Sequence, residues 1–156
     1  MRDMRCKMEN KNENPDILLL EDICKSVSLH ADTLTTVIGK TEDDGQKSLL
    51  SAMLDTCEGF VGTAKKRLQA FNTETKTLGM LEKLPSELSV VMSTLTDRSP
   101  SKIAELVIEN AVMGVSEFKE KIRNADEAGA SIENIRLAGD ILSFQEETIN
   151  KMRRYL

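Results

Sequence analysis

The segment NPDILLLEDICKSVSLHADTLTTVIG, residues 14–39, decides the fold of this 156-residue chain. Asn14 followed by Pro15 is typical of a helix start, because an Asn side chain caps free backbone N–H groups and proline is tolerated at the first helical position. We expect Gly39 to end the helix in the left-handed conformation. Between these limits the apolar residues recur at alternating steps of three and four, which places them along one side of a helix: Ile17, Leu20, Cys24, Val27, Ala31, Leu34 and Ile38.

The same spacing recurs in three later segments of the chain. The second helix is expected to take Thr41 as its cap, the third to begin at Ser99 and Pro100 and close at Gly129, and the fourth to begin at Ser131. Their inward positions are Leu50, Leu54, Cys57, Val61, Ala64, Leu68 and Phe71, then Ala104, Ile108, Ala111, Val115, Phe118, Ile122 and Ala125, and finally Ile135, Ala138, Leu142, Gln145, Ile149, Met152 and Leu156.

The connections between the four helices predict the topology. Short loops join the first helix to the second and the third to the fourth, so each pair should form an antiparallel hairpin. Residues 73–99 form a longer connection, in which Pro85 suits a helix start and Leu81, Leu84, Leu88, Val91 and Leu95 keep the apolar spacing. We therefore expect two hairpins joined by a long crossover that carries a short helix, rather than a simple up-down bundle with short loops. Residues 14–156 would form one all-α domain, a four-helix bundle, after a tail at 1–13.

This pattern resembles the ferritin-like superfamily, in particular its small rubrerythrin-like and uncharacterised single-bundle members. The resemblance covers residues 15–156 and is carried by segments such as LLEDICKSVS at 19–28, LLSAML at 49–54 and IAELVIENAVMGVSEFKEKI at 103–122. It implies a ferritin-like bundle, and in di-iron members of that group it implies metal ligands at the bundle centre. Those ligands are a Glu from each of two helices and a Glu-x-x-His from each of the other two.

The ligands of a di-iron site are missing here. The one histidine is His30, and the residue three positions before it is Val27. The predicted inward positions of the four helices contain no Asp, Glu or His. Gln145 is the one strongly polar residue among them. A hard cation needs oxygen or imidazole ligands. We therefore predict no metal site, no cofactor and no catalytic residues.

Four residues are candidates for a special role. His30 should lie at the edge of a helix contact; a phosphotransfer role is the alternative, although no acidic residue follows it directly. Cys24 and Cys57 should be buried core residues that share a layer, with a redox pair as the alternative. Gln145 should be buried and must find a backbone, hydroxyl, water or ligand partner. A further hypothesis places a close neighbour at Gly59 and Gly62, since glycine is unfavourable within a helix.

Composition narrows the class of protein. The formal charge of −5, from 21 Lys and Arg against 26 Asp and Glu, offers no basic surface for nucleic acid or for an anionic membrane. The first residues mix charges of both signs and lack the apolar stretch of a signal peptide, so we expect a cytoplasmic protein with reduced cysteines. The sequence favours a non-enzymatic binding or assembly protein, present as a homodimer or bound to another protein. The alternatives are a degenerate rubrerythrin-like metal-binding or redox protein and a histidine phosphotransfer protein.

Overall fold

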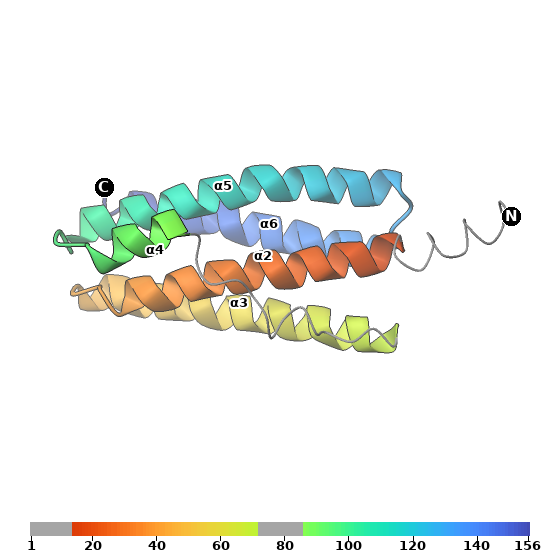
Figure 1. Ribbon diagram of the computed structural model, residues 1–156, viewed down its shortest axis with the longest axis horizontal. Coiled ribbons are helices and arrows are strands. Elements are labelled where there is room, and N and C mark those ends of the chain that lie inside the picture. Colours follow the sequence, from red (N-terminus) through yellow and green to blue (C-terminus); the bar gives the residue numbers. More distant parts are fainter. Residues whose placement is uncertain (1–13, 72–85) are drawn as a thin grey trace, which may run out of the picture.

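The computed structural model describes residues 14–71 and 86–156, and within these ranges the secondary structure is helical throughout, without a strand (Figure 1). The helices are α2 (Pro15–Ile38), α3 (Asp44–Ala70), α4 (Ser86–Ser93), α5 (Pro100–Glu127) and α6 (Ile132–Arg153). The all-α prediction is confirmed for this part of the chain. The predicted tail at 1–13, with Cys6, and the predicted apolar positions Leu81 and Leu84 lie outside the described residues.

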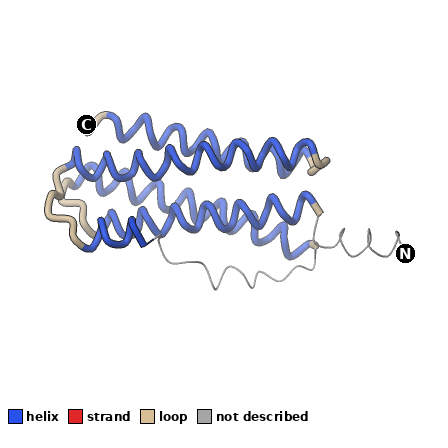
Figure 2. Tube along the Cα trace, turned by 45° about the horizontal axis from the view of Figure 1, so that its top comes forward, coloured by secondary structure: helices blue, strands red, loops and turns tan. Residues whose placement is uncertain are grey.

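The four long helices lie side by side along one axis, as Figures 1 and 2 show from two directions. Helix α2 packs against α3 and also against α5, and α5 packs against α6. Within each of the pairs α2/α3 and α5/α6 the two helices run in opposite directions, whereas α3 and α5 run in the same direction. Helix α2 is therefore the element that joins the two pairs.

Three of the predicted helix starts are confirmed. The Asn14 side chain accepts hydrogen bonds from the backbone N–H groups of Asp16 and Ile17, at 2.9 and 3.4 Å. The side chains of Ser99 and Ser131 accept from the third residue of α5 and of α6 in the same way. These side chains replace hydrogen-bond partners that the first turn of a helix lacks.

The predicted connection between α2 and α3 was wrong in two details. Gly39 has φ of −63°, a right-handed value, because the last turn closes through hydrogen bonds from the N–H of Gly39 to Thr35 O and of Lys40 to Val37 O. Thr41 is not the cap of α3, since its hydroxyl donates to Val37 O at 2.7 Å. Asp43 caps α3 instead, its carboxylate accepting from the N–H of Gln46 at 2.7 Å. The predicted close of α5 at Gly129 agrees with the observed end at Glu127, and Gly129 has a left-handed φ of 89°.

The crossover contains the short helix that was predicted. Helix α4 begins directly after Pro85, and its Met92 is buried among core side chains. The core runs along the whole length of the four long helices and includes fully buried Leu20, Leu50, Leu68 and Ile141.

The buried surface is wider and more polar than the sequence predicted. In α5 the buried side chains include Ile103, Leu106 and Val107, which lie beside the predicted line of inward positions. At the end of α3 the opposite error occurs, since Phe71 was predicted to be inward and is 40% exposed. The described residues also bury seven polar side chains, none of them Asp or Glu: His30, Thr33, Thr41, Gln46, Asn134, Gln145 and Thr148. An interior that is apolar except for Gln145 was therefore a wrong prediction. The reason is geometric, because a helix with neighbours on two sides buries more than one line of residues.

Candidate functional site

His30 is the centre of the candidate site. It lies on α2 with 5% of its surface exposed, so it is buried and not the edge histidine that was expected. Its ring meets that of Phe144 edge to face, with ring centroids 6.4 Å apart. The burial follows from the central position of α2, since the residues on the same line, Ile23 and Val37, are also fully buried.

Asn110 of α5 fixes the tautomer of His30, and burial keeps the ring neutral. The Nδ1 atom of His30 lies 2.9 Å from Oδ1 of Asn110. An amide oxygen only accepts hydrogen bonds, so Nδ1 carries the proton and Nε2 presents its lone pair. Burial lowers the pKa of the imidazole, and the bond to Asn110 opposes this shift only in part. His30 is consequently a neutral ring at neutral pH.

Two buried acceptors in this region lack a hydrogen-bond partner among the described residues. One is Nε2 of His30, and the other is Oε1 of Gln145, whose side chain is 3% exposed. Gln145 is buried as predicted. Its oxygen finds none of the backbone or hydroxyl partners that were considered, which leaves water or a ligand. An unpaired buried polar atom costs roughly 1–3 kcal/mol.

Both side chains line one pocket between α2, α5 and α6. The pocket has a volume of about 170 Å³ and is open to solvent on one side. Its wall also includes Asn110, Glu117 and Met113, the last of which is 67% exposed. Gly114 leaves space in the pocket because it has no side chain. A Cβ atom at this position would lie 3.6 Å from the Gln145 amide. A pocket of this size has room for several water molecules or for a small ligand.

The pocket contains part of a catalytic arrangement. His30, held by Asn110, has the form of a general base with an orienting partner. Ser26 lines the same pocket, but Nε2 of His30 accepts no hydrogen bond from it or from any other described residue. A nucleophile held by its base is the feature that would define acyl-transfer chemistry, and the described residues do not supply it.

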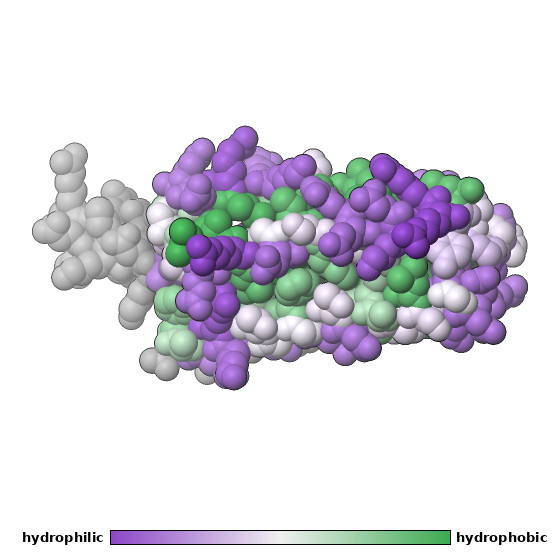
Figure 3. Space-filling model, turned by 180° about the vertical axis from the view of Figure 1, so that it is seen from behind, coloured by the Kyte–Doolittle hydropathy of each residue, from purple (hydrophilic) through white to green (hydrophobic). Residues whose placement is uncertain are grey.

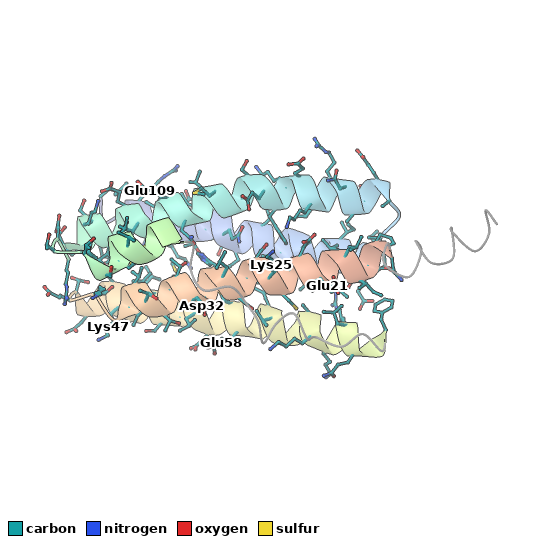
Figure 4. All side chains as sticks on the ribbon, viewed as in Figure 1. Glu21, Lys25, Asp32, Lys47, Glu58 and Glu109 are labelled. Carbon is teal, nitrogen blue, oxygen red and sulfur yellow. The ribbon has the colours of Figure 1, made fainter. Side chains whose placement is uncertain are left out.

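The charged side chains lie mostly on the outside of the molecule. Figure 4 shows Glu21, Lys25, Asp32, Glu58 and Glu109 projecting from the surfaces of α2, α3 and α5. Among the described residues, no three His, Cys, Asp or Glu side chains are grouped so that they could hold a metal ion. Seen from behind, hydrophilic residues alternate with separate apolar patches along the rod (Figure 3).

Cys24 and Cys57 are buried, reduced and part of the same apolar cluster. Burial raises the pKa of the Cys24 thiol to about 11 and that of the Cys57 thiol to about 12. Since the thiolate is the reactive form, both residues are poor nucleophiles in the folded protein. Their assignment to the core is confirmed.

A second polar cluster links α2 to α6 at the end of the molecule opposite the α2–α3 loop. Oδ1 of Asp16 accepts from the backbone N–H and the hydroxyl of Ser131 and from the Asn134 amide, all within 2.9 Å. Arg67 of α3 donates to Oδ1 of Asn134 at 3.0 Å. Each polar group has a partner here, so this cluster is a structural clamp between three helices.

The sequence alone did not reveal Asn110 as a partner of His30, nor Gln46, whose amide donates to Pro100 O at 2.9 Å. Each residue lies beside a charged neighbour, Glu109 or Lys47, and only the rotation of each helix about its axis turns it inward. Residues on two adjacent lines of α5 are buried, and the prediction used only the line through Ala104 and Ala111. Including the adjacent line would have placed Asn110 next to the core.

Comparison of the chain with models of known protein families, with curated proteins and with solved structures finds no match. Over the described residues, no helix is both long enough and apolar enough to cross a lipid bilayer.

Proposed function

We propose that this protein is a non-enzymatic binding protein built on a ferritin-like four-helix bundle that lacks the di-iron ligands, and that the pocket at His30 is its binding site. Support for the topology comes from the two antiparallel pairs and from the common direction of α3 and α5. In a bundle with two hairpins and one long crossover, the second and third long helices run the same way.

The observation that carries the proposed function is the pair of unpartnered acceptors, Nε2 of His30 and Oε1 of Gln145. Small-molecule sites are typically concave, largely apolar and equipped with a few fixed polar groups. A bound molecule with hydrogen-bond donors would relieve the cost of leaving these two atoms unpaired.

Phosphotransfer and metal-binding or redox functions have less support. A phosphotransfer histidine must meet a partner protein at the surface, whereas His30 is 5% exposed and bonded to Asn110. A metal-binding role through surface carboxylates or through Cys and His30 would need a group of such ligands, and the described residues contain no group of three. A redox role for Cys24 and Cys57 is opposed by the raised pKa of each thiol. Elemental analysis of untagged protein tests the metal-binding role directly, and stoichiometric iron, manganese or zinc would displace our proposal.

Fragment screening by NMR tests the proposed function. We expect small molecules to shift the amide signals of His30, Asn110 and Gln145 more than those at the opposite end of α2. In the variant Gly114→Leu the new side chain points toward Gln145 and fills the pocket, so these shifts should disappear.

Gly62→Leu is the matched control, because a Cβ at Gly62 would have no described atom within 4 Å apart from adjacent residues and its own helix backbone. It places the same side chain on a helix at an open position and should leave fragment binding unchanged. Shifts spread over the whole surface, or equal shifts in both variants, would contradict a specific site.

The proposed assembly is a homodimer or a complex with another protein. Its support is the exposure of adjacent apolar residues on α5, Val112 at 50% and Met113 at 67%. Sedimentation equilibrium over a range of concentrations should show self-association that Met113→Glu weakens. A monomer at all concentrations would remove the homodimer from the proposal.

A further inference from the structure

We infer that the ligand of this pocket is a small primary ammonium compound with a short alkyl chain. This inference rests on the proposed function, because it names the chemical class that the same site would select. The inference follows from the number of hydrogen-bond acceptors on the pocket wall and from the charge of the residues that line it.

The two fully buried polar atoms that lack a partner in the pocket are both acceptors. Nε2 of His30 presents a lone pair because Asn110 holds the proton on the other ring nitrogen. Oε1 of Gln145 is a carbonyl oxygen without a partner among the described residues. A ligand that pairs with both atoms must supply at least two hydrogen-bond donors, which excludes carboxylates and other pure acceptors.

The charge on the wall favours a cation. Among the described residues that line the pocket, Glu117 is acidic and none is Lys or Arg. An ammonium group has three N–H donors, which equals the number of acceptor groups formed by Glu117, His30 and Gln145. Hydrogen bonds in which one partner is ionised are shorter and stronger than neutral ones, so an amine gains more here than an alcohol.

The remaining wall suits an alkyl chain. Leu29 and Met113 line the pocket beside the polar groups, and Met side chains adapt to irregular apolar ligands. A volume of about 170 Å³ holds a chain of a few carbons and excludes a large ring system. A primary amine is far more basic than a buried imidazole, so the proton stays on the ligand and His30 remains an acceptor.

The experiment compares three probes with the same four-carbon chain, butylammonium, butanol and butyrate, in NMR titrations of the full chain near neutral pH. We expect butylammonium to shift the side-chain signals of His30 and Gln145 and to bind about tenfold more tightly than butanol. Butyrate should not bind. Tighter binding of butanol or butyrate at the same signals would overturn the cation assignment while leaving the proposed binding function intact.

A pair of charge-neutralising variants separates the site from the general acidity of the protein. Glu117→Gln removes the wall carboxylate and should weaken butylammonium binding by about three- to tenfold. Glu120→Gln, an exposed position on the same helix outside the pocket, should leave it unchanged. Equal effects of the two variants would contradict the inference. If none of the probes shifts these signals, the inference fails, and the fragment screen with Gly114→Leu decides separately whether the pocket binds other small molecules.

Discussion

His30 makes the stability of the protein depend on pH. Its folded-state pKa lies below the ordinary value of 6.5 because the ring is buried among Asn110, Phe144 and Gln145, with the Glu117 carboxylate on the same pocket wall. The unfolded chain therefore binds more protons than the folded chain as the pH falls below 6.5, and protonation favours unfolding. We expect full stability above pH 6.5 and a progressive loss from there down to the lowered folded pKa.

Denaturant unfolding at a series of pH values checks this expectation. The variant His30→Gln cannot titrate, so the difference between its curve and that of the native protein isolates the histidine. The native protein should lose stability relative to the variant as the pH is lowered through 6.5. Parallel curves over this range would show that His30 titrates in the same way in both states.

The two buried cysteines should react slowly with alkylating reagents. With pKa values of about 11 and 12 against an ordinary value of 9.0, Cys24 and Cys57 form at least about a hundredfold less thiolate than a free thiol at neutral pH. Mass spectrometry of individual peptides separates their alkylation from that of Cys6. Addition of denaturant should accelerate both reactions together, and fast alkylation of either residue in the native protein would contradict its burial.

Gly62 offers a test of helix propensity at a single position. The hypothesis that a neighbour approaches Gly59 and Gly62 has no support from the described atoms, since none lies within 4 Å of a Cβ at either position. Gly62→Ala should therefore stabilise the protein by about 1 kcal/mol. Thermal unfolding provides the measurement. Destabilisation by the added methyl group would point to a contact that the described residues do not contain.

At the scale of single helices, the Asp16 cluster connects α2 to α6. Burial alone would raise the pKa of the Asp16 carboxyl, but hydrogen bonds from Asn134 and Ser131 outweigh it and lower the pKa below 3.8. Asp16→Ala removes the acceptor for three donors at a half-exposed position, and we expect a loss of about 1 kcal/mol. Asp32→Ala, on the exposed side of the same helix, should have little effect. Equal losses in the two variants would contradict the clamp.

Local sequence signals predicted the helices well, and non-local contacts account for the errors. Asn14, Ser99 and Ser131 were correctly identified as caps because each acts on the backbone within three residues. The cap of α3 was misplaced because Thr41 and Asp43 both suit an N-cap, and only the course of the preceding turn decides between them. Buried His30 could not be predicted from its own helix, since its burial depends on the side chains that α5 and α6 bring against it.

At the scale of the whole molecule, the central position of α2 makes the two antiparallel pairs depend on each other. Helix α2 packs against α3 and against α5, and it has further contacts with α6. Leu20 of α2 is fully buried in the shared core, while its neighbour Leu18 is 43% exposed. A cavity at Leu20 removes packing that both pairs share, so it should weaken both of them and not α2 and α3 alone.

The variants Leu20→Ala and Leu18→Ala test this coupling by native-state hydrogen exchange. For Leu20→Ala we expect the free energy of unfolding to fall by about 2–5 kcal/mol, with equal loss of protection for the slowest amides of α3 and of α5. Leu18→Ala deletes the same number of atoms from a half-exposed position, and its effect should be well below that of Leu20→Ala. If Leu20→Ala lowers protection in α2 and α3 but spares α5 and α6, the two pairs unfold independently, and α2 does not couple them.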